Sequence, residues 1–462
     1  VRIPDTRAAS VAWLADNKTL LFNQTVDGWL NWFRIAANGK SGEEELTFDR
    51  QSNRALSLNA NRSQAVYLSG RNEVRIMELK DFQSRTILQD ELWGFDSSTP
   101  RFSPDGRYVA FTVFRNFEQD ILIHHVADGK TINLTDTGVT EADPCWSPDG
   151  KDLYFTANRR EPLYPRGGAD MRIWRLPLEK FDTAFRSEEF DKLFTEEKKD
   201  TSKEDKTNTA ATAPKDGATT PPADAAKPAD AKAPEKPKVT VTINLDDLLE
   251  RWQRVSPDAG RQVTPYVLQK DEETTVLYLS NHDGEAYNVW KTVRKPFDPP
   301  KTEKIAGAVA DDLLLAEAGG KLYLLVKGDI HELKPDANKL EKIEINHAFR
   351  RSLAHEFPQM FDEVWAGLQE NFYDETFHGV DWEAMKRRYE AFLPHLTSRA
   401  DLRTLLDDLL GELGASHLGF YSSGQEERPF HGTRTLATGL IFEPDDPYRV
   451  RAVAHASPLD RK

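Results

Sequence analysis

A serine and a histidine stand next to each other at positions 416 and 417, inside the segment Gly-Glu-Leu-Gly-Ala-Ser-His-Leu-Gly-Phe-Tyr. Histidine suits general acid–base chemistry because its unperturbed pKa, about 6.5, lies near working pH. A serine hydroxyl is a weak nucleophile until a base removes its proton. A lone Ser-His pair is seldom catalytic, so Ser416 and His417 are candidates that need support from the elements around them.

Three amphipathic helices are predicted immediately before this pair. Large apolar residues recur at helical spacing in three segments, with polar residues between them. They are Phe357, Phe361, Val364, Trp365, Leu368 and Phe372; then Trp382, Met385, Tyr389, Phe392 and Leu393; then Leu402, Leu405, Leu406, Leu409, Leu410 and Leu413. Because these residues follow the helical period, we interpret them as core and not as a cofactor site.

Capping signals mark the ends of two of these helices. Asp381 is suited to cap the second helix, and Pro394 with the residues just after it closes that helix. Ser398, with Asp401 three positions later, resembles the start of a capping box in which Asp replaces the usual Glu.

The third helix leads directly to the Ser-His pair. Gly414 is placed to end this helix in the left-handed conformation, and the apolar run at 418–422 predicts a strand. We therefore expect His417 at a helix-to-strand corner, held on both sides but able to face a cleft. The helices are expected to pack together and against that strand.

The chain before about residue 345 is repetitive. Two Ser-Pro-Asp-Gly elements, at 103–106 and 147–150, lie 44 residues apart, which matches a four-stranded propeller blade of roughly 40–45 residues. In each copy, Pro and Asp-Gly supply the backbone angles of a tight turn between two strands. Weaker copies occur at 11–22, 56–68, 276–291 and 313–326.

This repeat favours a β-propeller over the alternative, an all-β sandwich. We count six blades, and a seventh split between the two ends of the repeat region stays open. The Asp-Gly turns lack the spaced ligands and the terminal Glu of a calcium loop.

Residues 196–238 interrupt the repeats. The segment contains no Val, Ile, Leu, Met, Phe, Trp or Tyr and has six prolines, a composition that predicts disorder. We interpret it as a loop inserted within a blade, because a strand is predicted to resume at 239–245. A tether or docking tail is the less favoured interpretation. Residues 246–254 form either a short helical turn or a continuation of the strand.

Two short strands are predicted at 439–443 and 448–453, after which the sequence ends without a closing element. A strand pair of this length is not stable by itself. We therefore expect this sequence to be a fragment of a longer polypeptide.

Composition restricts the class of protein. A chain of 462 residues predicts two or three domains. Its net charge of -15 and 39% hydrophobic content predict a soluble, acidic protein and argue against a nucleic-acid binder. No run of about 18 apolar residues exists, so no membrane span is expected. The first residues show no leader, which was either never present or has been removed.

The remaining histidines and the single cysteine offer no other site. Cys145 is alone, so neither an internal disulfide nor a thiolate metal site is expected. His124 and His125 are neighbours in a predicted strand and face opposite sides. The other histidines considered, His355, His378 and His395, lack metal-ligand spacing. No Gly-rich phosphate loop precedes a helix, so we expect no metal, nucleotide or other cofactor.

The order of these motifs resembles the tricorn protease family, serine peptidases of the tail-specific-protease clan. The resemblance rests on the Ser-Pro-Asp-Gly blades, on a helical segment of the form His355-Glu356-Phe357…Trp365…Asn371-Phe372-Tyr373-Asp374, and on Leu413-Gly414-Ala415-Ser416-His417. It covers essentially the whole chain, and the helical segment with the Ser-His pair is its most specific part.

The resemblance implies a mainly β fold in three parts. Residues 1–345 would form a β-propeller of six to seven four-stranded blades. Residues 346–425 would form a small α-rich first core domain that carries the Ser-His pair. Residues 426–462 would be the truncated start of a PDZ-like domain.

The resemblance also implies roles for the pair. His417 corresponds to the general base that activates the nucleophile, and Ser416 to the adjacent member of a Ser-His-Ser-Glu tetrad, which helps to orient the far side of the active site. The nucleophilic serine and the acidic partner would lie in a second core domain outside this sequence. The implied reaction is acyl transfer followed by hydrolysis of the acyl-enzyme, and this chain alone is expected to hydrolyse nothing.

Partners follow from the same resemblance. It implies oligopeptide substrates, a propeller that acts as a gate or filter, and a homo-oligomer, commonly a hexamer. It implies a cytoplasmic protein, although the Ala- and Pro-rich segment would suit a periplasmic or exported one. The alternative function is a non-catalytic propeller module that binds proteins or peptides.

Overall fold

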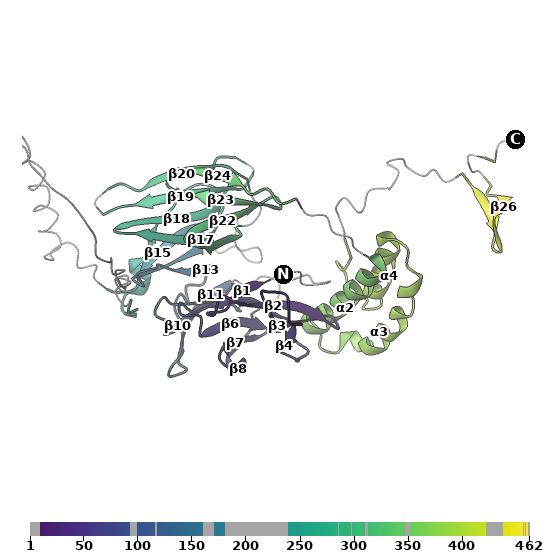
Figure 1. Cartoon of the computed structure of the whole chain (residues 1–462), viewed down its shortest axis with the longest axis horizontal. Coiled ribbons are helices and arrows are strands. Elements are labelled where there is room, and N and C mark those ends of the chain that lie inside the picture. The colour runs from purple at the N-terminus through teal and green to yellow at the C-terminus, as the bar shows by residue number, and fades with distance from the viewer. Residues whose placement is uncertain are drawn as a thin grey trace, which may run out of the picture. The chain divides into compact units, whose positions relative to one another are not determined.

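The computed structural model describes residues 10–92, 99–115, 118–159, 171–180, 239–284, 286–296, 298–309, 313–346, 352–421, 438–455, 457, 459 and 460. The chain divides into two compact units, residues 1–348 and 349–462 (Figure 1). In the described part of the chain, no helix is long and apolar enough to cross a membrane.

The first unit is a β-propeller whose described residues form six four-stranded antiparallel sheets, which we number as blades 1 to 6 in chain order. Blades 1 and 2 contain β1 (Val11–Trp13), β2 (Thr19–Val26), β3 (Trp29–Ala36) and β4 (Glu44–Glu45), then β5 (Asn53–Leu58), β6 (Gln64–Ser69), β7 (Glu73–Glu78) and β8 (Gln83–Gln89). Blades 3 and 4 contain β9 (Arg101–Phe102), β10 (Tyr108–Arg115), β11 (Glu118–His125) and β12 (Thr131–Asn133), then β13 (Glu141–Trp146), β14 (Asp152–Ala157), β15 (Arg172–Pro177) and β16 (Gln253–Arg254). Blades 5 and 6 contain β17 (Gln262–Lys270), β18 (Glu273–Ser280), β19 (Asn288–Arg294) and β20 (Lys301–Val309), then β21 (Leu315–Ala318), β22 (Lys321–Val326), β23 (Asp329–Lys334) and β24 (Lys339–Lys342).

Strands within each blade follow one another in sequence order, so every blade is a meander. The predicted propeller is confirmed and the sandwich alternative is wrong. The six blades coincide with the six repeats counted from the sequence.

The Ser-Pro-Asp-Gly elements form the first hairpin turn of blades 3 and 4. In the first copy, the Ser103 hydroxyl donates to Asp105 Oδ1 at 2.6 Å and accepts the Tyr108 backbone N–H at 3.0 Å. Gly106 takes a φ of 73°, which glycine adopts without steric cost. Ser147 makes the same two bonds in the second copy, at 2.6 and 2.9 Å.

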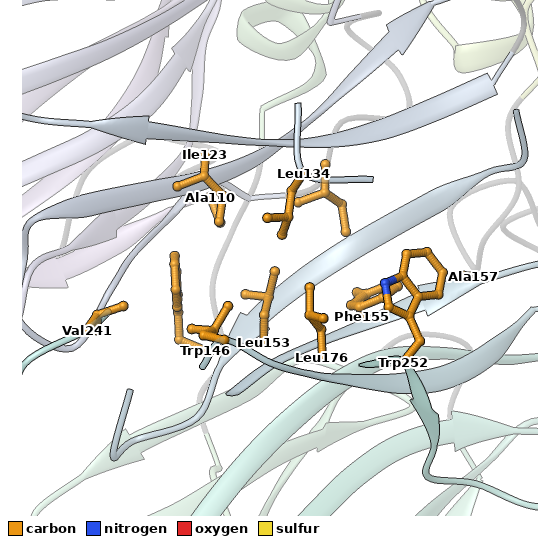
Figure 2. Packing of buried hydrophobic residues seen from close by; sticks show 12 residues of the cluster. Ala110, Ile123, Leu134, Trp146, Leu153, Phe155, Ala157, Leu176, Val241 and Trp252 are labelled. Carbon is orange, nitrogen blue, oxygen red and sulfur yellow. The ribbon is translucent and has the colours of Figure 1, made fainter. Parts of the chain in front are cut away.

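Neighbouring blades pack through apolar side chains, as blades 3 and 4 show (Figure 2). Strand residues of both blades share one buried cluster, and two residues from the segment after the insertion complete it. The members include Ala110, Ile121, Ile123, Leu134, Trp146, Leu153, Phe155, Leu176, Val241 and Trp252. Close-packed faces of this kind supply most of the stability of stacked sheets.

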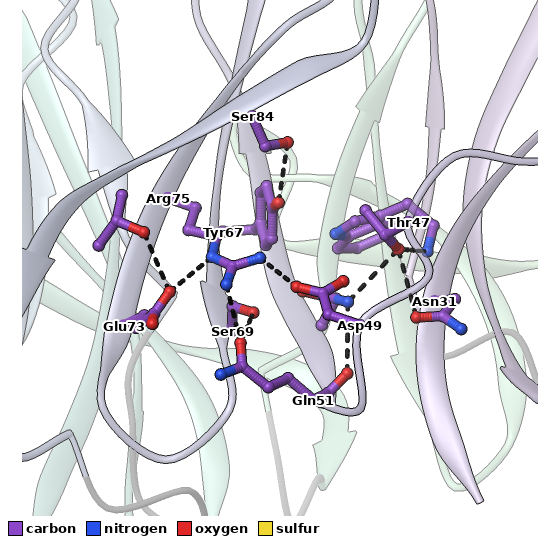
Figure 3. A network of polar contacts seen from close by, with 12 residues as sticks. Asn31, Thr47, Asp49, Gln51, Tyr67, Ser69, Glu73, Arg75 and Ser84 are labelled. Atoms are coloured by element: carbon purple, nitrogen blue, oxygen red, sulfur yellow. Dashed lines mark hydrogen bonds and ion pairs between the residues drawn. The ribbon is translucent and has the colours of Figure 1, made fainter. Parts of the chain in front are cut away.

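A polar network attaches the loop after blade 1 to blade 2 (Figure 3). Arg75 on β7 pairs with Glu73 at 2.6 Å and with Asp49 of the loop, and it donates to Gln51 at 2.9 Å. Gln51 also accepts the Ser69 hydroxyl at 2.9 Å. The Arg75 guanidinium therefore has two carboxylate partners and one amide acceptor, as a largely buried charge requires.

The long insertion falls inside blade 4, as predicted. β15 and β16 pair antiparallel, with Trp174 opposite Arg254, although residues 181–238 lie between them in the sequence. The disorder predicted for residues 196–238 concerns positions outside the described residues.

The strand predicted at 239–245 is wrong. The Val241 backbone N–H donates to the Asp105 carboxylate at 2.8 Å, and the Asn244 N–H donates to the Leu178 carbonyl at 2.8 Å, so no regular ladder forms. For residues 246–254 the short helical turn is the alternative that occurs, as the 3-10 helix η2 (Leu248–Arg251). β16 follows it as a separate strand that pairs with β15.

The second unit contains α2 (Leu353–Asn371), η3 (Phe377–Gly379), α3 (Trp382–Glu390), η4 (Leu393–His395), α4 (Arg399–Gly411) and the hairpin β25 (Leu440–Glu443) and β26 (Asp446–Val453). The three predicted helices and the two predicted strands are therefore present. The assignment of the hairpin to a PDZ-like domain stays a prediction.

The helix caps form as predicted. Asp381 accepts the Ala384 N–H at 2.9 Å, and Ser398 and Asp401 form a complete capping box. One core assignment is wrong, because α3 ends at Glu390 and leaves the Phe392 side chain 51% exposed. The residues up to Pro394 continue as turns and the 3-10 helix η4, which rotates Phe392 off the buried face.

Candidate functional site

The Ser-His pair lies on a short corner, residues 413–420, that follows α4. Leu402, Leu406 and Leu409 of α4 are buried, and this packing fixes the helix. Two further turn bonds, from the Leu413 N–H to Leu410 and from the Gly414 N–H to Gly411, tighten its end. The chain then reverses at Gly414, whose φ of 58° is the predicted left-handed conformation.

His417 itself has a φ of 65°. Such a conformation is uncommon for a residue with a side chain, and it persists only where surrounding contacts enforce it. Ser416 and His417 are both exposed. In the described part of the chain, neither side chain makes a hydrogen bond or an ion pair, so both imidazole nitrogens of His417 are open to an outside partner.

Two side chains anchor the corner from either end. His378 Nδ1 lies 2.7 Å from the Leu413 carbonyl oxygen, and Asp407 Oδ1 accepts the Phe420 backbone N–H at 2.9 Å. His417 is therefore four residues after one anchor and three residues before the other.

The strand predicted at 418–422 is wrong for its described residues, because 418–421 have no strand conformation. A strand exists only when its backbone groups pair with a neighbouring strand. Here the Phe420 N–H is taken by the Asp407 carboxylate instead. The corner is thus a helix end followed by an anchored irregular segment.

Sequence reasoning missed both anchors. His378 lacks metal-ligand spacing and shows no other local signal for contact with residue 413, and Asp407 lies on the exposed face of a well-patterned helix. A local signal existed for the turn that carries His378, since Asp374 followed by Thr376 is typical of an Asx-type turn. Nothing local indicates that this turn meets residue 413.

The adjacent histidines of blade 3 face opposite sides of β11, as predicted. His124 is buried, with its Nδ1 2.8 Å from the Thr131 hydroxyl, and burial lowers the pKa of its imidazole. His125 is half-buried and pairs with Asp128 at 2.8 Å. Among the residues that the structure describes, no group of three or more His, Cys, Asp or Glu side chains is placed to hold a metal ion.

Comparison with known proteins identifies the helical unit. Residues 353–411 match the family model of the tricorn protease C1 domain. The helical unit of this chain is thus similar to the C1 domain of tricorn proteases. The matched residues end at Gly411, so the Ser-His corner begins just beyond the matched region of this tricorn C1 domain.

Two curated relatives come from Streptomyces coelicolor. Putative tricorn protease homolog 2 is 27% identical over 121 residues, which are 25% of this chain and 10% of that protein. Tricorn protease homolog 1 is 38% identical over 64 residues, which are 14% of this chain and 6% of that protein. The matches thus span a tenth or less of the length of these relatives.

The fold resembles a crystal structure of the tricorn protease, with a TM-score of 0.64 and 14% identity. The similarity covers 91% of this chain and 38% of the solved one. At this level of identity the similarity is one of fold.

Proposed function

We propose that this chain is part of a tricorn-like serine peptidase that degrades oligopeptides through an acyl-enzyme. The observation that carries the proposal is the exposed His417 imidazole, held on a corner anchored at both ends, directly after a tricorn C1 domain. An accessible base on a fixed backbone is what general-base catalysis requires.

In this proposal His417 takes the proton of a serine hydroxyl that another part of the full-length protein supplies. The same imidazole then returns the proton to the leaving amine. Ser416 lies beside it and helps to orient the far side of the site through its hydroxyl. The nucleophile and the acidic partner come from outside this sequence, so the chain alone hydrolyses nothing.

The propeller acts in this proposal as a gate or filter for peptides, and the full-length protein works as a homo-oligomer. We place it in the cytoplasm, with an exported protein as the alternative. The similarity to the tricorn C1 domain and to a tricorn protease homolog supports each of these points.

The deciding experiment compares the full-length protein with its His417→Asn variant on fluorogenic oligopeptides. Asn tolerates the left-handed backbone of position 417 but is no base. Loss of hydrolysis with an unchanged assembly supports the proposal. Undiminished turnover overturns the role of His417 as the base. A full-length parent protein that hydrolyses none of these peptides overturns the peptidase proposal and favours a non-catalytic propeller module.

A further inference from the structure

A left-handed turn lies between α2 and α3. Phe377, His378 and Gly379 have φ values of 52°, 55° and 83°. Left-handed residues are uncommon unless they are glycine, so Phe377 and His378 each cost conformational free energy that other contacts must offset. Such strained turns persist where the surrounding structure over-determines them, and they occur at functional positions.

A carboxylate holds the turn from one side. Asp374 Oδ1 accepts the Thr376 N–H at 2.9 Å and the Thr376 hydroxyl at 2.8 Å, while Oδ2 accepts the His378 N–H at 2.9 Å. The backbone and hydroxyl bonds of Thr376, followed by the His378 N–H, lower the pKa of the Asp374 carboxyl. The carboxylate is therefore in its charged form when it makes these bonds.

Aromatic packing holds the turn from the other side. The buried Phe377 ring stacks on Phe372, with centroids 5.3 Å apart, and on Trp382, with centroids 5.4 Å apart. These contacts fix Phe377 in spite of its unfavourable backbone. The next side chain, His378, packs with its ring edge-to-face on Phe372, with centroids 5.4 Å apart.

The His378 imidazole reaches the end of α4, 35 residues further along the chain. Its Nδ1 lies 2.7 Å from the Leu413 carbonyl, which only accepts, so Nδ1 carries the proton. Its Nε2 then accepts the Tyr373 hydroxyl in the neutral tautomer. Carbonyls at a helix end have no partner within the helix, and His378 supplies one for Leu413.

We propose that His378 is a positioning residue for His417. Its imidazole fixes the Leu413 carbonyl, so the corner that carries the base leaves α4 in one direction, and the strained turn exists to place that imidazole. The inference rests on the proposed role of His417 for its catalytic consequence, but the mechanical part concerns this chain alone.

The first test is mechanical and uses the 462-residue chain. His378→Gly removes the imidazole and relieves the left-handed backbone, whereas His378→Asn keeps a donor and tolerates that backbone. Hydrogen–deuterium exchange is followed for peptides covering 414–421. We expect exchange to rise about tenfold in the Gly variant and to stay within about threefold of the parent in the Asn variant. Unchanged exchange in the Gly variant overturns the proposal.

The second test is catalytic and uses the full-length protein. His378→Gly is expected to lower kcat by about 10- to 100-fold with KM within about twofold, and His378→Asn is expected to recover most of kcat. Faster exchange at 414–421 with an unchanged kcat also overturns the positioning role. If His417→Asn itself retains activity, the proposed function fails, while the exchange result still decides whether His378 holds the corner.

If His378→Gly fails to fold, a second pair of variants, His378→Asp and His378→Asn, tests the same proposal. His378→Asp has the shape of Asn and tolerates the same backbone, but its carboxylate cannot donate to the Leu413 carbonyl. Exchange at 414–421 should therefore be faster in His378→Asp than in His378→Asn. Equal exchange in the two variants contradicts the proposal.

Discussion

Trp365 and Trp382 exchange hydrogen bonds: each indole N–H donates to the backbone carbonyl of the other residue, at 3.0 and 3.2 Å. Both side chains are buried. The pair joins the middle of α2 to the first residue of α3, and the turn that carries His378 lies between them in the sequence. The two indoles therefore close the loop from which the corner is anchored.

Trp365→Phe should destabilise the helical unit, because the Trp382 carbonyl loses its buried partner and the smaller ring leaves a cavity. We expect the free energy of unfolding to fall by about 2–4 kcal/mol. Urea denaturation of the second unit, followed by tryptophan fluorescence and by circular dichroism, measures this. The exposed Phe392 provides a control, since Phe392→Leu should change stability by less than about 0.5 kcal/mol.

His417→Asn in the full-length protein should lower kcat for oligopeptide hydrolysis by about 10²–10⁴-fold, the usual contribution of a positioned general base. His395→Asn is the matched control, because His395 is an exposed histidine on η4. Its activity should stay within about twofold of the parent. A loss of similar size in both variants would indicate a general effect of removing a surface imidazole and would contradict the assigned role.

Glu141 predicts a pH-dependent stability of the propeller. Its side chain is fully buried, and burial raises the pKa of its carboxyl from 4.5 to about 8, with the charges of Asp120 and Glu118 adding to the shift. The folded state therefore holds this proton more tightly than the unfolded state. Stability is unaffected below about pH 4.5, falls as pH rises from 4.5 to 8, and is lower by a few kcal/mol above that range.

Glu141→Gln removes this dependence, because the amide matches the protonated carboxyl in size and carries no charge. Thermal unfolding at about pH 5 should differ little between variant and parent. At about pH 9 the variant should unfold at a temperature several degrees higher. An identical pH dependence for the two proteins would show that Glu141 does not titrate in this range.

The two Ser-Pro-Asp-Gly turns offer a matched pair of glycine substitutions. Gly106 and Gly150 have nearly the same φ, 73° and 72°. A Cβ at Gly106 meets no atom within 4 Å, whereas one at Gly150 would lie 2.7 Å from Val241 Cγ2. Gly106→Ala should cost about 1 kcal/mol of backbone strain, and Gly150→Ala should cost about 1–3 kcal/mol more through the clash.

Urea denaturation of the two variants side by side measures that difference. The comparison also tests the position of the segment after the insertion, because Val241 belongs to it. Equal destabilisation would mean that Val241 does not pack on the blade 4 turn.

Local chemistry made much of this fold predictable. The blade turns follow from Ser-Pro-Asp-Gly, because a glycine at positive φ and a serine–aspartate bond form within a few residues of one another. The helices follow from the 3.6-residue period, and the caps at Asp381 and Ser398 depend only on neighbours three positions away. Six blades could be counted because each repeat carries its own turn.

The two incorrect strand predictions share one physical cause. Residues 239–245 and 418–421 are apolar and suited to strands, but a strand needs a partner, and the partner is a tertiary property. The Val241 N–H donates to the Asp105 carboxylate, 136 residues away in the sequence, and the Phe420 N–H donates to the Asp407 carboxylate. In both cases a carboxylate displaced the expected ladder.

The candidate base, His417, also shows which features are local to the sequence and which depend on tertiary structure. The sequence alone placed His417 after a patterned helix and a left-handed glycine, and so determined which residue to consider. Only the tertiary structure revealed that His378 caps the Leu413 carbonyl from a strained turn 35 residues upstream. A hydrogen bond between a side chain and a distant backbone carbonyl leaves no periodicity and no local motif, because it depends on how α2, α3 and α4 pack.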